Sequence, residues 1–501
     1  MADRELACDV LVVGGGTSGF TAAVLAARSA ARVIVIEKNA ETGGEGMVSG
    51  SNGNFGGGTD YQKAAGVADS PGLFFEEMSK WDPKADPEVL KAYTENTVAT
   101  LHFLRDLGVK WDYNAAPNAD AGSSVGRIHT VVGGGPALYS VMRPALEAAG
   151  GKVLTQTKGM KLLTDSRGAV TGVLARDREG SLELKSKATI LTCGGFQGNL
   201  EMMTRYVSRD AAYALLRGLP TNTGDAVLMG LEAGAATKAM ERVHGYVHVP
   251  PYPIPYPLHP FALPQNPPDG KHVGIPGLLM DGFAHCIVVN IRGERFADES
   301  RPRLGEHMCN ALLRQPEAIG YAIADSPLYD TYLKEVVESA ADGWKRLGYG
   351  PPRVETAGTL EELAGKIEIN PGVLGSTVGE YNKAVQEGTA HLLRIPKANR
   401  DPAGLYQKLA INFLHRIETP PFHAVLVIAG YSHSNGGLAI NAKGQVLDRE
   451  KKVIPGLYAA GDTAVLWHGN YAQGYSQAHT QGYIAGKNAV AGLHTLSRNT
   501  H

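Results

Sequence analysis

The sequence predicts an α/β protein in which one doubly wound domain is interrupted by an inserted α+β domain. Residues 1–37 read as strand, glycine-rich turn, helix and strand. From about residue 435 the alternating strand and helix pattern returns and ends in a long helix. Between these two parts, nine of the 28 prolines fall within residues 249–268. A Rossmann-like domain split by a cap domain accounts for this pattern. The predicted boundaries are residues 1–243, 244–433 and 434–501.

Composition and charge narrow the class of protein. A chain of 501 residues exceeds one ordinary hydrophobic core, so two domains are expected. The formal net charge of −2 gives no electrostatic reason for a nucleic-acid partner. No apolar run approaches the roughly 20 residues that span a bilayer, and no signal-peptide pattern opens the chain. We therefore expect a cytoplasmic enzyme without a membrane span. No Cys-x-x-Cys pair supports a metal cluster or c-type haem, the cysteines being Cys8, Cys193, Cys286 and Cys309.

The opening segment predicts a βαβ unit. Val10–Val13 is a continuous apolar run, as in a parallel strand buried on both faces. A helix of small residues, Phe20–Arg28, follows the glycine-rich turn. A second apolar strand, Val33–Ile36, ends at Glu37.

Three glycines between the first strand and the helix form a dinucleotide-binding pattern. Gly14 permits a tight turn, Gly16 lets the backbone approach a pyrophosphate, and Gly19 lets the helix pack on the sheet. The helix N-terminus offers free N–H groups to the phosphates. Glu37 can accept hydrogen bonds from ribose hydroxyls. The pattern therefore predicts a bound dinucleotide.

The predicted secondary structure changes in the middle of the chain. Helical periodicity dominates from about residue 85 to 150, and alternating strands return between residues 152 and 195. The proline-rich stretch cannot be helix or central strand and must be loop or polyproline II. It is either a surface excursion near a domain boundary or a stiff apolar rim over a substrate entrance, carrying Tyr252, Tyr256 and Phe261.

Two further glycine-rich segments favour FAD over NAD. Thr42–Gly50 follows Glu37, and its small residues let the backbone approach a flat ring. Ile454–Asp462 comes over 400 residues later and places a carboxylate after a strand, ahead of a long helix from about Ser476 to Leu493. An extended dinucleotide crossing both halves of the domain would use both segments, and FAD fits that span.

At these motifs the chain resembles the fumarate reductase/succinate dehydrogenase flavoprotein family, which includes ketosteroid dehydrogenases. The resemblance covers nearly the whole chain and rests on Gly14–Gly19, Glu37–Lys38, Thr42–Gly44, Thr192–Phe196, Asn222–Asp225, Val289–Phe296 and Pro455–Asp462. It implies that Asp462 binds the ribityl chain of FAD. It also implies that the helix near Ser476 points its N-terminus at the flavin pyrimidine ring, where the dipole stabilises negative charge.

The same resemblance implies the full set of cofactor contacts. No family histidine stands where covalent flavin attachment occurs, so non-covalent FAD is expected. The implied cofactor-binding residues are Gly14, Gly16, Thr17, Ser18, Gly19, Glu37, Lys38, Gly43, Gly44, Gly46, Cys193, Gly194, Asp225, Gly461, Asp462 and Ser476.

For catalysis, the resemblance implies hydride transfer between flavin N5 and one carbon of a C–C bond activated by a carbonyl or carboxylate, while a protein group handles the proton. Arg303 falls at the position of the family's proton-donating arginine. Because an isolated arginine is a poor acid, a nearby carboxylate is needed, and Glu299 is the candidate. Arg303 could instead be a salt-bridge residue or a substrate anchor. His433 matches the family's substrate-binding histidine, with a structural role as the alternative.

Two departures from the family bear on the substrate. Members that reduce fumarate carry an arginine beside the flavin, and the matching segment His468–Ser476 contains none. Tyr246 stands in place of the first cap histidine, with His244 and His248 nearby. Without that bidentate guanidinium, a C4-dicarboxylate substrate is disfavoured.

The sequence therefore predicts an FAD-dependent oxidoreductase that desaturates or reduces a C–C bond next to a carbonyl. Its substrate would be a neutral or mono-anionic, partly apolar small molecule such as a ketosteroid-like ketone, with an external electron donor or acceptor. Arg303 or Tyr471 would handle the proton, unless Tyr471 is a packed core residue, and His433 with His468 would polarise the carbonyl. Two alternatives stay open. One is a carboxylate-specific fumarate- or tricarballylate-like enzyme with Arg301, Arg303 and His433 as the anion clamp, and the other is a flavin-binding protein without catalysis.

Overall fold

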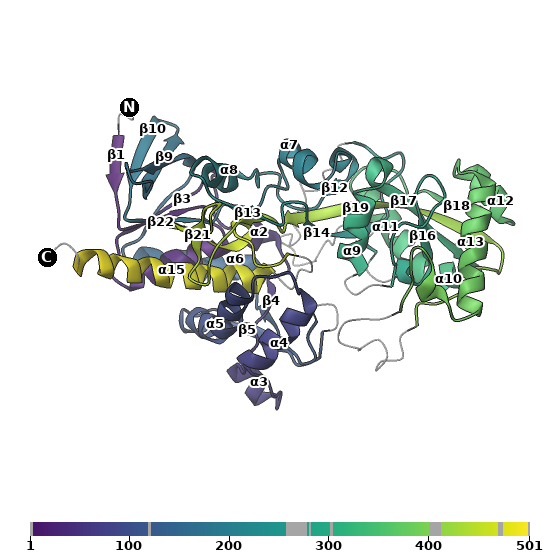
Figure 1. Cartoon of the computed structure of the whole chain (residues 1–501), viewed down its shortest axis with the longest axis horizontal. Coiled ribbons are helices and arrows are strands. Elements are labelled where there is room, and N and C mark those ends of the chain that lie inside the picture. The colour runs from purple at the N-terminus through teal and green to yellow at the C-terminus, as the bar shows by residue number, and fades with distance from the viewer. Residues whose placement is uncertain are drawn as a thin grey trace. The chain divides into compact units, whose positions relative to one another are not determined.

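The computed structural model describes residues 4–118, 122–256, 278–279, 282–300, 304–399, 412–468 and 474–498. The chain forms two compact units (Figure 1). The first unit takes residues 1–199, 221–242 and 434–501, and the second takes residues 200–220 and 243–433. Several predicted positions lie outside the described residues, namely Phe261, Arg301, Arg303, Tyr471 and most of the proline-rich stretch.

The first unit is built on a six-stranded sheet that is parallel except at one edge, where β21 runs antiparallel to β22. Every residue of its two central strands β2 and β3 is buried, and Val10 lies opposite Val33. Continuous apolar runs suit such strands because both faces of the sheet are covered. In spatial order the strands are β21 (Gln445–Leu447), β22 (Val453–Ala459), β11 (Ala188–Leu191), β2 (Val10–Val13), β3 (Val33–Ile36) and β7 (Lys152–Leu154).

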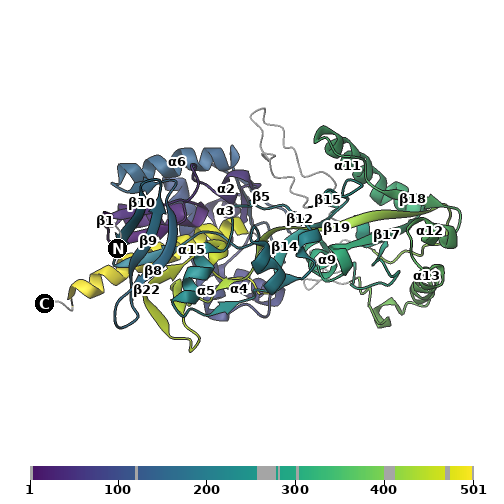
Figure 2. The same cartoon turned by 90° about the horizontal axis from the view of Figure 1, so that it is seen from above.

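Two helices pack on this sheet and closely on each other, α1 (Thr17–Arg28) and α15 (Gly474–Arg498), the latter yellow in Figures 1 and 2. A Cβ atom added at Gly482 would lie 2.4 Å from the carbonyl oxygen of Ser18, and one at Gly486 would lie 2.8 Å from that of Ala22. These glycines stand about one helical turn apart. They let the backbones of the first and last segments of the chain touch, which ties the two segments together.

The region from residue 85 to 150 is helical only in part. Helix α5 (Pro87–Asp106) begins where the Asp86 side chain accepts hydrogen bonds from the first-turn N–H groups, and α6 (Gly134–Ala148) ends the region. Between them, β5 (Trp111–Asn114) and β6 (Ile128–Val131) form a three-stranded sheet with the distant β4 (Asn52–Asn54). The strand β6 lies between the other two, and its partner β4 is far away in the sequence, so local periodicity carries no signal of that pairing.

The remaining elements of the first unit are short helices and two smaller sheets. They are α2 (Glu45–Val48), α3 (Asp60–Ala64), α4 (Pro71–Trp81), α8 (Asp225–Glu232), the pair β13 (Thr237–Lys238) and β20 (Gly437–Leu438), and the sheet β1 (Arg4–Ala7), β10 (Gly180–Lys185), β9 (Val170–Asp177) and β8 (Lys158–Thr164).

The second unit is α+β, with a mainly antiparallel sheet at its centre. The long strand β19 (Phe422–Ser434) crosses it, and all seven residues of its neighbour β17 (Ile319–Asp325) are buried. The sheet also contains β15 (Leu278–Leu279), β14 (Val243–His248), β16 (Ile287–Val289), β12 (Leu215–Leu216) and β18 (Val354–Ala357). The helices are α7 (Leu200–Met202), α9 (Leu304–Leu312), α10 (Ser326–Leu328), α11 (Lys334–Arg346), α12 (Leu360–Lys366) and α13 (Pro371–Gln386).

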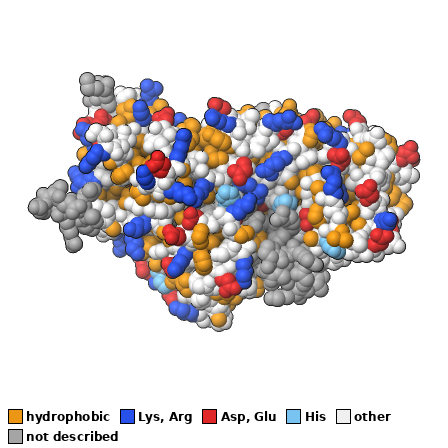
Figure 3. Space-filling model, in the orientation of Figure 1, with side chains coloured by type: hydrophobic (Ala, Val, Ile, Leu, Met, Phe, Trp, Pro, Cys, Tyr) orange, Lys and Arg blue, Asp and Glu red, His pale blue; other side chains and the backbone are white. Residues whose placement is uncertain are grey.

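Surface charge is mixed. Basic and acidic side chains are interspersed over the face in Figure 3, in keeping with the formal net charge of −2. Among the helices of the described residues, none combines the length and the apolar character that crossing a bilayer requires.

Candidate functional site

The turn between β2 and α1 requires its first and last glycines. Gly14 has φ +110°, and a Cβ atom there would lie 2.5 Å from the carbonyl oxygen of Thr192. A Cβ atom at Gly19 would lie 2.1 Å from the carbonyl oxygen of Gly14. Positive φ and backbone contacts this short exclude any other residue without movement of the chain. The two glycines therefore fix the shape of the turn.

The middle glycine of the turn faces open space. A Cβ atom at Gly16 would meet no atom within 4 Å. Gly16 is the N-cap of α1, and this helix has neither a side-chain cap bond nor an acidic residue in its first turn. Its first amide groups and the positive end of its dipole are therefore available to an anion. The opening suits the pyrophosphate of a dinucleotide.

The end of β3 places an acceptor beside this turn. The Glu37 carboxylate is buried and accepts hydrogen bonds from the backbone N–H of Gly15, at 2.9 Å, and of Asn39, at 2.8 Å. An ionised carboxylate accepts up to about four hydrogen bonds, so it keeps capacity for the hydroxyls of a ribose. The two backbone contacts hold it in place for that role.

Lys38 and Asp225 are brought together, and the sequence did not indicate that a third residue joins them. Lys38 Nζ lies 2.7 Å from one carboxylate oxygen of Asp225, and Lys158 Nζ lies 3.0 Å from the other. Burial alone would raise the pKa of Asp225, but the two lysines outweigh it and hold the pKa below its ordinary value. Asp225 is thus an ionised residue that holds both lysines beside the β3 end.

The segment after β3 is held against the turn by a buried tyrosine. Gly43 N–H donates to the carbonyl oxygen of Gly15 at 2.8 Å. Tyr139, on α6, donates its hydroxyl to the carbonyl oxygen of Gly43 at 2.9 Å and lies 3.1 Å from Thr17 Oγ1. A Cβ atom at Gly46 would lie 2.2 Å from that same Thr17 oxygen. Tyr139 is far from the motif in sequence, and no local pattern marks it.

At the C-terminal side, Asp462 follows a glycine that packs on the first helix of the unit. This glycine is Gly461, whose φ is +68° and whose added Cβ would lie 2.6 Å from Ser18 Oγ. Burial raises the pKa of Asp462 to about 7. Hydroxyl donors would stabilise the ionised form and lower that pKa again. The ribityl chain of FAD carries such donors.

Buried polar atoms near the start of α15 fit the polar edge of a flavin ring. Both amide atoms of Asn54 and Oε1 of Gln477 are buried and find no hydrogen-bond partner within the described part of the chain. An added Cβ at Gly53 would lie 2.7 Å from the backbone nitrogen of Ser476, whose hydroxyl lies 2.8 Å from Tyr93 OH. Unpaired buried groups are costly, so a ligand with N–H and carbonyl groups is expected here. These observations fit FAD.

Cys193 and Gly194 lie at the end of β11. Cys193 Sγ lies 3.1 Å from the carbonyl oxygen of Val13, and burial raises the pKa of its thiol to about 12. The thiol is therefore an un-ionised group that closes the edge of the turn. Gly194 has φ +76°, a conformation that favours glycine.

The second unit contains a separate cluster of rings around His433. His433, near the end of β19, stacks on His244 of β14 with ring centroids 4.8 Å apart. Nδ1 of His244 lies 3.4 Å from a carboxylate oxygen of Glu306, which is buried on α9. Tyr246 meets the ring of His244 edge-on at 5.0 Å. The carboxylate orients His244, and His433 is half exposed beside it.

The comparison with protein families decides which family this is. The model of the family described as FAD binding domain matches residues 9–475, which is most of the chain. The chain belongs to the FAD binding domain family. This match, together with the relatives described below, confirms three predictions. They are the fold class, the cofactor FAD and the resemblance to the fumarate reductase and ketosteroid dehydrogenase flavoproteins.

Similar proteins cover between 71% and 96% of this FAD-binding chain. It is 29% identical to fumarate reductase (cytochrome) of Shewanella frigidimarina over 491 residues, covering 96% of this chain and 77% of the relative. It is 28% identical to urocanate reductase of Eggerthella lenta over 499 residues, covering 96% and 74%. The 3-oxosteroid 1-dehydrogenase of Mycobacterium tuberculosis is 27% identical over 375 residues, covering 71% and 62%.

Solved structures agree with this assignment. The open conformation of a flavocytochrome c3 fumarate reductase has a TM-score of 0.67 at 26% identity, covering 98% of this chain and 79% of that chain. The 3-ketosteroid-delta4-(5alpha)-dehydrogenase from Rhodococcus jostii has a TM-score of 0.70 at 24% identity, covering 98% of each chain, and shows the shared fold. The FAD-binding chain is an oxidoreductase acting on carbon–carbon bonds.

The other predicted catalytic residues are only partly placed. Arg303 and Tyr471 lie outside the described residues of this FAD-binding protein. Glu299, the candidate partner of Arg303, is fully buried and paired with Arg295 at 2.9 Å, and it also accepts from Val288 N–H at 3.0 Å. His468 is partly exposed, and its backbone N–H donates to the buried carboxylate of Asp82 at 2.6 Å.

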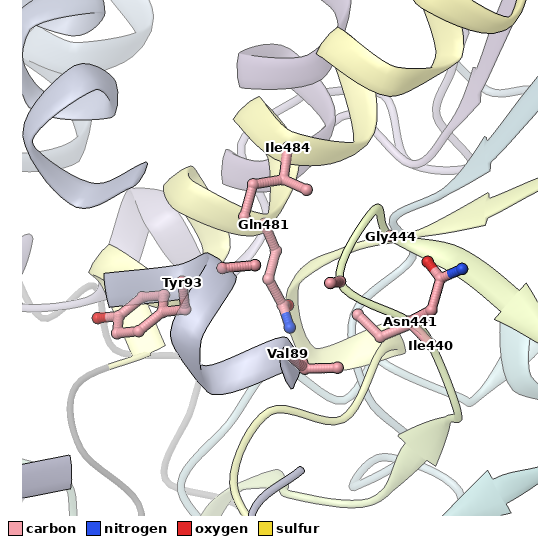
Figure 4. Close-up of a pocket in the computed structure, with 9 residues that line it drawn as sticks. Val89, Tyr93, Ile440, Asn441, Gly444, Gln481 and Ile484 are labelled. Atoms are coloured by element: carbon pink, nitrogen blue, oxygen red, sulfur yellow. The ribbon is translucent and has the colours of Figure 1, made fainter. Parts of the chain in front are cut away.

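A small pocket lies between α5, α15 and the loop before β21 (Figure 4). In Figure 4 the Gln481 amide reaches from α15 toward Val89 on α5. The pocket has room for about one water molecule, so it cannot hold the substrate or FAD. Both amide atoms of Gln481 lack a partner among the described residues, which is what an ordered water would satisfy.

Proposed function

We propose that this flavoprotein oxidises or reduces a C–C bond next to a carbonyl in a neutral or mono-anionic, partly apolar substrate such as a ketosteroid-like ketone. We also propose that residues 244–433 form the substrate domain and that residues 1–243 and 434–501 hold non-covalent FAD. The observation that carries the substrate assignment is the stack of His244 and His433, because it offers oriented imidazole hydrogen-bond donors at the predicted substrate position.

The chain's own residues have distinct parts in this chemistry. Bound FAD supplies a two-electron redox centre that exchanges a hydride at N5. The buried Glu306 carboxylate fixes the orientation of His244, and His244 supports His433 from one face. His433 is half exposed and can donate to a substrate carbonyl, as His468 is proposed to do. Arg303 or Tyr471 transfers the proton at the neighbouring carbon.

A second candidate is a carboxylate-specific enzyme, favoured by relatives named fumarate reductase and urocanate reductase. Arg301, Arg303 and His433 would then bind the anion. The absence of an arginine from His468–Ser476 in the sequence removes one guanidinium that a dicarboxylate would use. For this reason we favour a substrate with at most one negative charge over a dicarboxylate.

The test is turnover by the purified FAD-loaded enzyme. Photoreduced enzyme would be mixed anaerobically with a panel of enones, unsaturated monocarboxylates and unsaturated dicarboxylates, and flavin reoxidation followed by absorbance. Dye reduction with the saturated partners tests the reverse direction. Reoxidation by enones or monocarboxylates supports the proposal. Turnover of fumarate with none of the enones or monocarboxylates would move the assignment to the dicarboxylate class, and a flavin unresponsive to the whole panel would reject it.

A further inference from the structure

An arginine that no motif includes lies beside the ring cluster of the second unit. Strand β12 pairs in parallel with β19, Leu215 opposite Gly430 and Leu216 opposite Tyr431 (Figure 1). The backbone N–H of Arg217 then donates to the carbonyl oxygen of Tyr431 at 2.7 Å, so Arg217 continues this register. Its half-buried side chain is thereby held at a defined level of the sheet.

A glycine on β19 lets this side chain reach across the strand. A Cβ atom at Gly430 would lie 3.2 Å from Cδ of Arg217 and 2.5 Å from Cδ2 of His248. The neighbouring strand β14 also approaches this position closely. A Cβ atom at its Gly245 would lie 2.4 Å from the carbonyl oxygen of Gly430. The aliphatic part of Arg217 therefore passes over a position without a side chain and brings the guanidinium to β14.

Two contacts within the described part of the chain orient the guanidinium. Its carbon lies 4.7 Å above the ring centroid of Tyr246, and Nη1 donates to Ser432 Oγ at 3.1 Å. Stacking on an aromatic face fixes the plane of a guanidinium and favours its positive charge, while the serine hydroxyl fixes its rotation in that plane. A guanidinium held in this orientation can donate two parallel N–H···O hydrogen bonds to a carboxylate.

These residues connect directly to the predicted substrate histidine. Ser432 precedes His433 in the chain, and Tyr246 touches His244, which stacks on His433. Arg217, Tyr246, Ser432 and His433 are all half exposed. Among the described residues, a row of one guanidinium and three rings thus presents a positive charge next to aromatic ring surface.

We infer that Arg217 and Ser432 bind the carboxylate of a mono-anionic unsaturated acid, with Tyr246 contacting the apolar part of the same molecule. The inference rests on the proposed function and narrows its substrate to the class with one carboxylate. One guanidinium in this row pairs with one carboxylate, and the adjoining rings favour a planar, conjugated remainder over a second charged group. The serine hydroxyl, which accepts from Arg217, directs its own proton to the second carboxylate oxygen.

The test compares acids with amides of the same shape. Full-length, FAD-loaded enzyme would be photoreduced and reoxidised anaerobically with cinnamate and cinnamamide, and with acrylate and acrylamide. For wild type we expect the acids to react with the higher kcat/KM. In Arg217→Met, KM for the acids should rise by about 10- to 100-fold, since a charge-assisted hydrogen bond is lost, while the values for the amides change less than about twofold. Arg217→Lys should recover part of the loss, and Ser432→Ala should cause a smaller rise.

Arg353 provides a matched control in the same unit. Its guanidinium also lies over a tyrosine, 5.0 Å from the ring centroid of Tyr252. Its carbonyl oxygen accepts from Leu426 N–H, which places it six residues along β19 from Ser432, or roughly 20 Å away. Arg353→Met should therefore leave acids and amides alike unchanged. Bound flavin content and far-ultraviolet circular dichroism check that each variant is folded.

The outcomes separate this inference from the proposed function. Equal losses for acid and amide in Arg217→Met, with flavin retained, would show that Arg217 only joins β12 to β14 and would overturn the inference. A wild-type enzyme that reacts with enones but binds none of the acids would also overturn it, while leaving the proposed function in place. If enones, acids and amides all fail to reoxidise the flavin, the proposed function fails together with it.

Discussion

The affinity of the protein for FAD should fall as the pH drops below 7, because of a single carboxyl group. Burial raises the pKa of Asp462 to about 7 from its ordinary value of 3.8. We propose that the ribityl chain of bound FAD would donate hydroxyl hydrogen bonds to the ionised carboxylate, which would lower the pKa of Asp462 in the complex. Below pH 7 the carboxyl must then lose a proton when FAD binds. Affinity is therefore greatest above pH 7 and decreases as the proton competes.

The size of this effect follows from proton linkage. The dissociation constant should rise about fivefold between pH 7 and pH 6 and about ninefold between pH 6 and pH 5, or about 50-fold in all, until the pKa of the complex is approached. It would be measured by the quenching of FAD fluorescence on titration into deflavinated protein between pH 5 and pH 8. Asp462→Asn should bind FAD more weakly at pH 8 and show almost no pH dependence.

A second carboxylate supplies the control for this measurement. Lys38 and Lys158 hold the pKa of Asp225 below its ordinary value, so Asp225 stays ionised throughout the titration. Asp225→Asn should accordingly keep the wild-type slope, whatever it does to the affinity itself. Parallel slopes for wild type and Asp462→Asn would refute the assignment of the proton to Asp462.

Three other changes test the architecture of the site. Gly19→Ala should abolish FAD binding and destabilise the fold by about 1–3 kcal/mol, because its Cβ would lie 2.1 Å from a backbone oxygen; flavin content and urea unfolding measure both. Gly486→Ala should also lower the free energy of unfolding, whereas Gly375→Ala on α13, where an added Cβ meets nothing within 4 Å, should raise it by about 0.5–1 kcal/mol. The packing argument requires the free energy of unfolding to fall in Gly486→Ala and to rise in Gly375→Ala. A change in the same direction in both variants would contradict it. Precipitation with trichloroacetic acid should release all of the flavin into the supernatant, and colour left in the protein pellet would show a covalent bond instead.

Local sequence determined the parts of this protein that depend on neighbouring residues. The run Val10–Val13, the glycines at 14, 16 and 19 and the helix after them lie within residues 10–28, and each is predicted by short-range rules on burial, φ angles and helix ends. The second apolar strand and Glu37 complete the same unit. These rules were sufficient for the fold class and for FAD, both of which the family comparison confirms.

Only the tertiary structure decided which distant residues meet. Tyr139 and Lys158 contact the proposed FAD-binding segments from elements more than 100 residues away from the glycine motif, and Arg217 reaches Ser432, the neighbour of His433, on the adjacent strand β19. The strand β6 was hidden for the same reason, since its pairing with β4 is non-local. Periodicity reports which face of an element is buried, but it carries no information on the partner that buries it. The sequence therefore identified the cofactor. The contacts between distant segments were needed to find Arg217, the positively charged residue that we propose binds the substrate carboxylate.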